Sequence, residues 1–254
     1  MRSGAGWRLE ERGGGLAWSA FGRAGDTVGF RVTSRKSKLY HQRGIAERLA
    51  GAVLEAVPEV SVDTAKAAED EADGAEPGAA APGSRQLFVV RVLHDRCLVS
   101  ADASGDLLHR RGYRQATAKA PLRETLAASL LLASGWDGTH PLLDPLCGSG
   151  TIPIEAALLA RRIPPGLGRH FRFEGWPGHE ARAWSREVDA ARSLVLPRAP
   201  VAIAGSDRDA GAIAAARANA ERAGVSGDVA FEQAPLSSAT FPAGDIGWVV
   251  TNPP

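Results

Sequence analysis

PLLDPLCGSGTIPIEAALLA, residues 141–160, is the stretch that decides the predicted fold. It begins as an apolar segment that ends in Asp144, turns through Gly148–Gly150 and continues as a helix. Pro153 fits the first turn of that helix, because an N–H group there has no intrahelical partner to lose. A strand, a glycine turn and a helix N-terminus together form a place where a ligand can approach bare backbone.

The spacing of this turn excludes two common phosphate-binding motifs. No Gly-Lys-Ser/Thr follows, so the turn is not a P-loop. It holds only two glycines and no acidic residue lies about 20 residues further on, so it is not the dinucleotide-binding fingerprint either. Taken alone, the turn can equally be a structural corner. The first acidic residue that ends a later apolar strand is Asp207, in VAIAGSD at 201–207.

The chain after residue 200 alternates apolar strands with a helix. Strands are predicted over 201–205, 229–231 and 246–250, and an alanine-rich helix over 209–223. This alternation predicts a parallel sheet whose ligand lies beyond the carboxyl ends of the strands. The residues expected at those ends are Asp144, Gly148–Gly150, Asp207 and Asn252. Their convergence predicts one shared site.

Residues 28–101 predict a small α+β module. Apolar residues alternate with polar ones at its start, recur at helical spacing in its middle and alternate again at its end. The expected elements are a strand over 28–33, a basic turn over 34–38, a helix over 45–56 and strands over 87–93 and 97–101.

Two stretches beside this module receive no regular structure. Residues 1–27 are rich in glycine and arginine, with weak periodicity. The stretch 63–84 is predicted to be a disordered insertion, because it has too little apolar surface to offset its ordering entropy. Between Glu59 and Ser84 one lysine stands against seven acidic residues, a net charge of −6. The whole chain carries +1, so the remainder carries +7, which is compatible with a polyanionic partner.

A further helix is predicted just before the glycine turn, over 120–132. Pro121 falls in its first turn, and Leu122, Leu126 and Leu130 recur on one face. Because this helix leads directly into the strand of the glycine turn, we expect it to cover the ligand side of the sheet.

An insertion separates the first βα unit from the second strand of the sheet. It contains Phe171, Phe173 and Trp176, which we expect to pack as an apolar cluster, and a helix is predicted over 179–194. His170 and His179 have no other metal-ligand residues at suitable spacing, so no metal site is expected.

Composition places the chain among ordinary globular proteins of one or two domains. Hydrophobic residues make up 44% of its 254 residues and charged residues 23%. No apolar run approaches the ~20 residues that a bilayer-spanning helix requires. Cys97 and Cys147 give neither a disulfide framework nor a metal-ligand pair, which favours a reducing cytoplasm.

Three motifs carry a resemblance to a known family. DPLCGSGT at 144–151, GSDRD at 205–209 and TNPP at 251–254 resemble motifs I, II and IV of class I S-adenosylmethionine-dependent methyltransferases. The chain is similar to the bacterial THUMP-domain guanine-N2 methyltransferases that act on 23S ribosomal RNA. RVTSRKSKLYH at 31–41 and DASGDLLHRRGYR at 102–114 resemble the THUMP domain and its exit segment.

The resemblance covers about residues 28–254 and implies an α/β fold. It implies a Rossmann-like methyltransferase sheet, with parallel strands and helices on both faces, preceded by a small α+β THUMP-like domain. The domains implied are a poorly defined segment 1–27, a THUMP-like RNA-binding domain 28–104, a connector 105–120 and the N-terminal part of a methyltransferase domain 121–254.

The resemblance also implies S-adenosylmethionine as the cofactor. Asp144 would counter the ammonium group of the cofactor, and Asp207 would accept its ribose hydroxyls. The implied cofactor-binding residues are Asp144, Cys147, Gly148, Ser149, Gly150, Thr151 and Asp207. Asn252 and the carbonyl of Pro253, in the motif that Pro254 completes, would be the catalytic residues and would hold the exocyclic amine of a flipped guanine.

RNA is the partner that the THUMP-like region implies, with neither a membrane nor a metal. The implied phosphate contacts are Arg35, Lys36, Lys38, Arg110, Arg111, Arg114 and Lys119. For any one of them an ordinary solvated loop is the alternative. Tyr40 and Tyr113 are candidates to stack on bases, and packing within their own domain is the alternative for each.

Two departures from the family pattern limit these implications. Pro235 stands in EQAPLS at 232–237, where an acidic contact to the adenine ring is often found, so that contact stays unassigned. The chain also ends at Pro254, before the aromatic residue and the further strands that usually follow. We therefore expect a fragment with impaired cofactor affinity and a turnover close to absent.

Three alternatives remain open at this point. Transfer RNA could replace ribosomal RNA as the substrate of the same chemistry. An N6-adenine DNA methyltransferase shares the Asn-Pro-Pro motif but does not explain the THUMP-like region. A catalytically silent RNA-binding protein would bind RNA without responding to S-adenosylmethionine.

Overall fold

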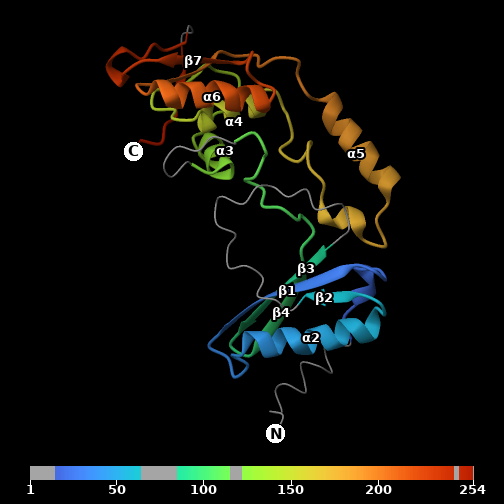
Figure 1. The fold of residues 1–254 in the computed structure, drawn as a ribbon. Helices are drawn as coiled ribbons and strands as arrows, with labels where there is room; N and C mark the ends of the chain where they lie inside the picture. The colour runs from blue at the N-terminus through green and yellow to red at the C-terminus, as the bar shows by residue number, and fades with distance from the viewer. Residues whose placement is uncertain (1–14, 64–84, 115–121, 243–245, 254) are drawn as a thin grey trace. The chain divides into compact units, whose positions relative to one another are not determined.

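The computed structural model describes residues 15–63, 85–114, 122–242 and 246–253 (Figure 1). The insertion predicted over 63–84 lies outside the described residues except for Asp63, which ends a strand, and Lys119, Pro121 and Pro254 also lie outside them. The chain divides into two compact units, one formed by 1–106 with 170–182 and the other by 107–169 with 183–254. No described helix combines the length and the apolar character that crossing a bilayer requires.

The N-terminal unit is a four-stranded sheet with one long helix on it. Its strands are β1 (Thr27–Arg35), β2 (Ser61–Asp63), β3 (Arg85–Leu93) and β4 (Arg96–Ala101), in the order β2-β1-β3-β4. β1 pairs in parallel with β2 and β3, whereas β3 and β4 form an antiparallel hairpin. His94 and Asp95 form its turn, both at positive φ, as a two-residue hairpin turn requires.

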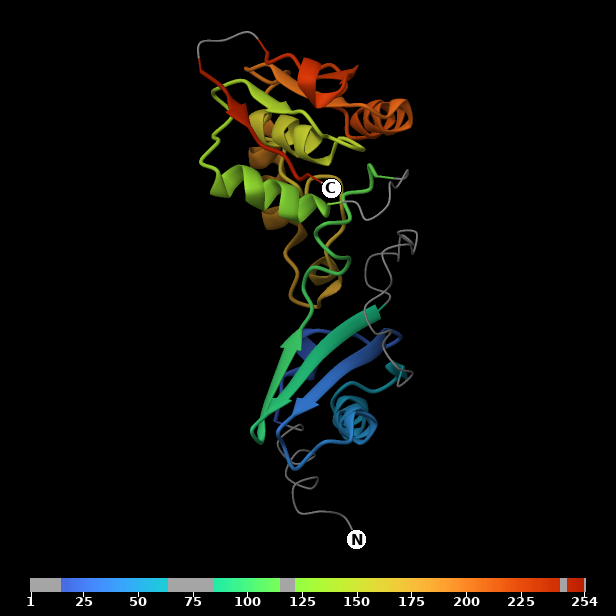
Figure 2. The same cartoon turned by 90° about the vertical axis from the view of Figure 1, so that its left-hand side faces the viewer.

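Helix α2 (Gln42–Ala56) covers one face of this sheet (Figures 1 and 2). Ile45, Leu49 and Val53 recur at helical spacing and pack on alternate residues of β1 and β3. The predicted strands and helix of this module are thus confirmed within a few residues. The short strand β2 was missed because three residues carry too little periodicity for detection.

The region predicted to lack structure before residue 28 contributes to the core. A 3-10 helix, η1 (Trp18–Ala20), places Trp18 edge-on against Phe30 and Phe88. Trp18 is buried and belongs to the same apolar cluster as the α2 residues. The expectation of no firm structure over 1–27 is therefore wrong from residue 15 onward.

Residues 170–182 belong to the N-terminal unit, although they interrupt the other unit in sequence. They include the 3-10 helix η2 (Arg172–Gly175). The indole N–H of Trp176 donates to Gln86 Oε1 at 2.7 Å, and its ring meets Phe21 edge-on. Arg172 pairs with Asp102 at 3.2 Å. The aromatic cluster is thus a packed insertion, as predicted, but the division of the chain differs from the predicted boundaries at 104 and 121.

The second unit is built on a parallel sheet. Its strands are β5 (Leu142–Asp144), β6 (Ile203–Asp207), β7 (Val229–Gln233) and β8 (Trp248–Val249), in the order β7-β6-β5-β8, and every pair is parallel. The order reverses at β5, so the ends of β5, β6 and β8 meet at a topological switch point. The predicted strands and their parallel pairing are confirmed.

Three helices, α3 (Glu124–Ala133), α4 (Thr151–Ala160) and α6 (Ala210–Arg222), pack around this sheet (Figure 2), and a 3-10 turn, η3 (Leu236–Ser238), follows β7. A fourth helix, α5 (Ala181–Ser193), has no buried residue. α4 contacts β5, β6 and β7, α6 contacts β6 and β7, and α3 packs on α4. The unit has one apolar core, in which Trp136, Leu142 and Ile154 are almost fully buried.

Helix α3 differs from its prediction in both start and orientation. It begins at Glu124, four residues later than predicted, with Arg123 as its N-cap. Leu126 and Leu130 are exposed, whereas Ala127 and Leu131 are buried. The predicted apolar face is therefore wrong by one residue. Ala127 and Leu131 have the same i, i+4 spacing as Leu126 and Leu130, so periodicity alone does not show which of the two pairs is buried.

Candidate functional site

The glycine turn that follows β5 is the centre of the candidate site. Cys147 N–H donates to the Ser206 carbonyl at 2.9 Å, and Gly150 N–H donates to the Cys147 carbonyl at 2.8 Å. Gly148 and Gly150 both lie in the left-handed region, at φ 53° and 84°. The turn is therefore tied to the end of β6 and delivers the chain into α4, in which Pro153 occupies the first turn as predicted.

The two glycines of the turn serve different purposes. A Cβ at Gly150 would lie 2.9 Å from Ala216 Cβ and 2.9 Å from Phe231 Cζ, so this glycine lets α6 and β7 approach the turn. A Cβ at Gly148 would meet nothing within 4 Å. Gly148 thus faces open space, and its bare backbone is the part of the turn that a ligand can reach.

We expect Gly150→Ala to destabilise this unit far more than Gly148→Ala does. Both changes place a Cβ in the left-handed region, at a cost of about 1 kcal/mol each. The change at Gly150 adds overpacking against the buried Ala216 and the half-buried Phe231, typically about 1–3 kcal/mol more. Urea denaturation measures the difference, and equal losses for the two variants would contradict the packing role.

Asp144 is a buried carboxylate at the end of the central strand. Its side chain is only 2% exposed, and Oδ1 accepts a hydrogen bond from Leu146 N–H at 3.2 Å. Burial raises its pKa from 3.8 to about 6, an effect that the Thr251 hydroxyl and the Leu146 N–H reduce and the nearby Asp207 charge increases. A desolvated carboxylate that borders open backbone is poised to bind a cation.

Asp207 ends β6 beside this turn. Its Oδ2 accepts a hydrogen bond from Gly148 N–H and its Oδ1 accepts one from Asp209 N–H, each at 3.0 Å. Asp209 in turn caps α6, since its side chain accepts hydrogen bonds from the N–H groups of Gly211 and Ala212. Two acidic residues predicted to lie at adjacent strand ends are therefore linked through the glycine turn.

The other predicted residues of the turn have buried side chains. Cys147, Ser149 and Thr151 are each less than a tenth exposed. Burial, followed by the charges of Asp144 and Asp207, raises the pKa of the Cys147 thiol, which makes the thiol unreactive. Any contact that these three residues make with a ligand therefore runs through main-chain atoms, above all at the N-terminus of α4.

Asn219 is a residue of this site that sequence analysis missed. Its amide is fully buried, and Nδ2 donates to the Ser149 carbonyl at 3.0 Å. Arg222, which has only donors, binds Asn219 Oδ1 and so fixes the orientation of the amide. Arg222 also donates to the Tyr113 carbonyl at 2.6 Å. One sequence signal could have identified this residue. Asn219 is a polar residue three positions after Ala216, on the face of an alanine-rich helix that is buried.

The segment after β8 brings the remaining predicted residues to the same edge of the sheet. Leu143 pairs with Val249, and Val250 N–H donates to the Leu143 carbonyl at 3.1 Å. The Thr251 hydroxyl lies close enough to Asp144 to lower its pKa. Asn252 and Pro253 follow directly and are exposed. The carboxyl ends of β5, β6 and β8 thus lie at one edge of the sheet, as expected for parallel strands.

Two arginines of the segment 102–114 do not lie where their predicted role as phosphate contacts requires. Arg111 pairs with Glu155 of α4 at 2.8 Å, and Arg114 pairs with Glu124 of α3 at 3.5 Å. Both guanidinium side chains are 9% exposed, which contradicts the expectation that they face an RNA backbone. Tyr113 is also buried, and its hydroxyl donates to Glu155 at 3.0 Å instead of stacking on a base. Arg110 is half-buried.

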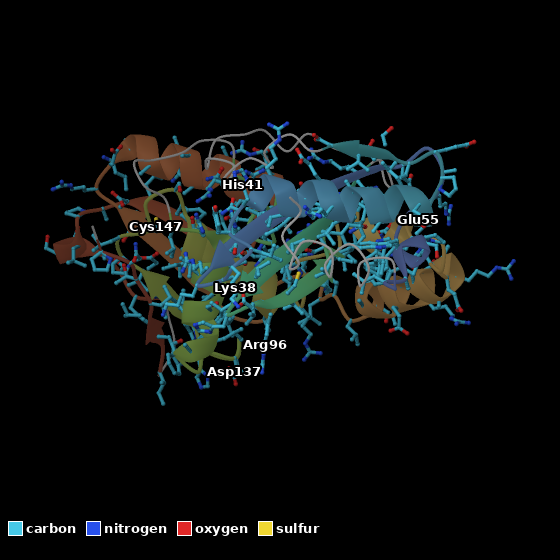
Figure 3. All side chains as sticks on the ribbon, turned by 90° about the horizontal axis from the view of Figure 1, so that it is seen from below. Lys38, His41, Glu55, Arg96, Asp137 and Cys147 are labelled. Carbon is cyan, nitrogen blue, oxygen red and sulfur yellow. The ribbon has the colours of Figure 1, made fainter. Side chains whose placement is uncertain are left out.

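The predicted basic turn of the N-terminal unit is exposed. Arg35, Lys36 and Lys38 all face solvent, and Tyr40 is 77% exposed. Lys38 N–H donates to Asp95 at 2.7 Å, which ties this turn to the β3–β4 hairpin. Figure 3 shows Lys38 and Arg96 at one end of this unit and Glu55 at the other.

No cluster of three His, Cys, Asp or Glu side chains in the described ranges could hold a metal ion. His170 instead pairs with Glu174 at 3.4 Å. The described residues of the candidate site supply carboxylates, backbone N–H groups and an exposed amide.

Comparisons with solved structures agree with this architecture. A predicted N6-adenine-specific DNA methylase from Listeria monocytogenes superposes with a TM-score of 0.81 at 30% identity, covering 100% of this chain and 63% of the other. SMU.472, a methyltransferase complexed with SAH, superposes with a TM-score of 0.79 at 28% identity, covering 98% and 63%.

Curated proteins named ribosomal RNA large subunit methyltransferase K/L are similar in sequence. The protein from Chromohalobacter salexigens is 36% identical over 248 residues, which is 93% of this chain and 32% of that protein. The protein from Shewanella baltica OS185 is 45% identical over 161 residues, 61% of this chain and 23% of that protein. The chain thus spans a third or less of the length of these relatives.

The family description "RMKL-like, methyltransferase domain" (UPF0020) matches residues 111–254. This range contains all of the strand-end residues described above and more than half of the chain. With the parallel sheet, the glycine turn and the paired acidic strand ends in place, the chain belongs to the RMKL-like methyltransferase family.

Proposed function

We propose that this protein is an S-adenosylmethionine-dependent RNA methyltransferase that modifies the exocyclic N2 of a guanine in 23S ribosomal RNA, in the cytoplasm. The observation that carries the proposal is the buried Asp144, set beside the Gly148–Asp207 contact at the switch point of the sheet. The names of the curated relatives supply the substrate class, and the SAH complex of one structural neighbour supports the cofactor.

In this proposal the chain holds the cofactor by charge and by backbone. Asp144 neutralises the ammonium group, and the open backbone at Gly148 receives the amino-acid end of the cofactor. Asp207 accepts the ribose hydroxyls, because each carboxylate oxygen can accept a second hydrogen bond beside the N–H group it already binds. A sulfonium methyl donor is already activated, so positioning supplies most of the catalysis, roughly 7–11 kcal/mol.

Asn252 and the Pro253 carbonyl orient the nucleophile. Two acceptors can bind both protons of an exocyclic amine and so direct its nitrogen lone pair at the methyl group. A base inside a helix cannot reach this position, so the guanine is flipped out of its stack. The nitrogen attacks the methyl carbon, the S–CH₃ bond breaks with its electron pair on sulfur, and the amine loses its extra proton to solvent.

The N-terminal unit supplies the RNA contacts in this proposal. Its resemblance to a THUMP domain, the exposed turn with Arg35, Lys36 and Lys38, and the exposed ring of Tyr40 support a polyanion-binding role. Contacts of this type set affinity and register without reading sequence.

Cofactor binding by the 254-residue chain tests the proposal. We expect saturable binding of S-adenosylhomocysteine in calorimetry, and at least about tenfold weaker binding in Asp207→Ala, because two hydrogen bonds to a charged group are lost. Glu221→Ala, an exposed carboxylate on α6, is the matched control and should bind like the parent chain. Absence of binding by the parent chain, or equal binding by Asp207→Ala, would contradict the proposed site.

A further inference from the structure

The sheet of the N-terminal unit has one face that no described helix covers. α2 packs on the face formed by the even-numbered residues of β1 and β3, such as Phe30, Phe88 and Val90. The odd-numbered residues point the other way, because side chains alternate along a strand. Leu93 on β3 and Leu98 on β4 belong to this second face and are 50% and 59% exposed.

Besides Arg85, strand register gathers four further arginines on that open face. Thr33, Arg91 and Leu98 lie side by side across β1, β3 and β4, and Arg35, Leu93 and Arg96 form the next row. Arg31 lies two residues before Thr33 on the same face. Arg35, Arg91 and Arg96 are exposed, and Arg31 is half-buried. Neighbouring strands lie about 4.8 Å apart and alternate residues of a strand about 6.7 Å apart, so the four groups form one patch.

Within the described part of the chain, these four arginines have no acidic partner. Asp63 of β2 points to the same side, but it pairs with Arg85 at 2.8 Å, and the Arg85 side chain lies over Gly29 to reach it. Arg31 Nε is buried without a hydrogen-bond partner among the described groups. Guanidinium groups in a row without counter-charges raise the local concentration of a polyanion.

We infer that this open face, defined by Arg31, Arg35, Arg91 and Arg96, is the surface on which the N-terminal unit docks the RNA phosphate backbone. The inference rests on the proposed function and assigns the contact to the sheet in addition to the turn at 36–38. Arg35 and Arg96 border that turn, and Lys38 lies at the same end of the unit as Arg96 (Figure 3). The cationic patch therefore continues from the sheet into the turn.

The chemistry of the face favours RNA over a protein partner. Four cations without carboxylates of their own match a phosphate chain, in which every nucleotide carries a negative charge, whereas an ordinary protein surface mixes both signs of charge. Leu93 and Leu98 alternate with the arginines and offer apolar contact to ribose and unpaired bases. Guanidinium planes can also stack on such bases.

Two double variants of equal charge change test the inference. Arg91→Gln with Arg96→Gln removes two exposed cations from the open face. Arg43→Gln with Arg48→Gln removes two cations from α2, of which Arg43 is exposed and Arg48 is half-buried. Binding of a fluorescein-labelled 20-nucleotide single-stranded RNA is measured by anisotropy between 50 and 200 mM salt. We expect the first pair to weaken binding about tenfold or more and to reduce the salt slope by about 1.4, since each phosphate contact on a single strand contributes about 0.7.

The control pair should change affinity less than threefold. Equal losses in the two pairs, or no loss in the face pair, would overturn the inference while leaving the proposed function in place. Absence of RNA binding by the parent chain would instead overturn the RNA part of the proposed function. Arg43, Arg91 and Arg96 are exposed and Arg48 is half-buried, so circular dichroism verifies that each variant is folded.

Discussion

Replacing Asp144 by Asn is expected to weaken S-adenosylhomocysteine binding by about 10–100-fold at pH 7. The change keeps the shape of the side chain and removes its charge. At a site that is 2% exposed, a hydrogen bond to a charged group contributes about 1.5–3 kcal/mol, and each 1.4 kcal/mol corresponds to a factor of ten. Isothermal titration calorimetry measures the ratio of dissociation constants directly.

The pH dependence of cofactor binding, compared between the parent chain and Asp144→Asn, gives a second test of this role. Because the pKa of Asp144 is raised to about 6, the free protein holds this group neutral at pH 5 and ionised at pH 7. Cofactor affinity of the parent chain should therefore rise between pH 5 and 7, while the cofactor ammonium stays charged. The affinity of Asp144→Asn should not change with pH through this group. A parallel rise in both proteins would contradict the assigned role.

Asp144→Asn should stabilise the folded protein at pH 7, although it weakens cofactor binding. A carboxyl group whose folded pKa lies above its unfolded value contributes stability at low pH, and that contribution is lost as pH rises through about 6. A shift of about two pKa units corresponds to roughly 3 kcal/mol. Asp144→Asn should thus unfold at a higher temperature than the parent chain at pH 7, which separates a binding defect from misfolding.

The location of the site was predictable because it depends on local patterns and one topological rule. Asp144, Asp207 and Asn252 each follow an apolar strand, and parallel strands place such residues at one edge. The glycines of the turn were also recognisable. The different structural roles of Gly148 and Gly150 could not be predicted, because the close approach of Ala216 and Phe231 to Gly150 joins segments more than 60 residues apart.

The misassigned residues depend on contacts that no sequence period encodes. Asn219 lies within the predicted alanine-rich helix, but only the structure brings its side chain to the Ser149 carbonyl. The segment 170–182 interrupts the methyltransferase unit in sequence but packs on β-strand ends of the other unit through Trp176. Arg111 and Arg114 read as a basic run, because sequence does not reveal whether an arginine faces water or a buried carboxylate.

The buried pair Arg111–Glu155 leads to the second large prediction. Glu155→Ala is expected to destabilise the methyltransferase unit by about 3–5 kcal/mol, because it leaves a guanidinium group buried without its counter-charge. The same substitution also removes the acceptor of the Tyr113 hydroxyl. Urea denaturation at pH 7 measures the loss. Arg43→Ala, which breaks the exposed Arg43–Glu47 pair of α2 at 2.9 Å, is the control and should cost less than about 1 kcal/mol.

A double variant separates the ion pair from the packing around it. Arg111→Met with Glu155→Leu removes both charges and keeps most of the side-chain volume, so it should recover most of the stability lost in Glu155→Ala. If Arg111 instead served RNA, Glu155→Ala would leave stability within about 1 kcal/mol of the parent chain, and Arg111→Met would weaken RNA binding. The geometry favours the first outcome, because Glu155 is 4% exposed and burial raises its pKa against the opposing effect of Arg111. A carboxylate in that position requires a fixed cation, and Arg111 is the group that supplies it.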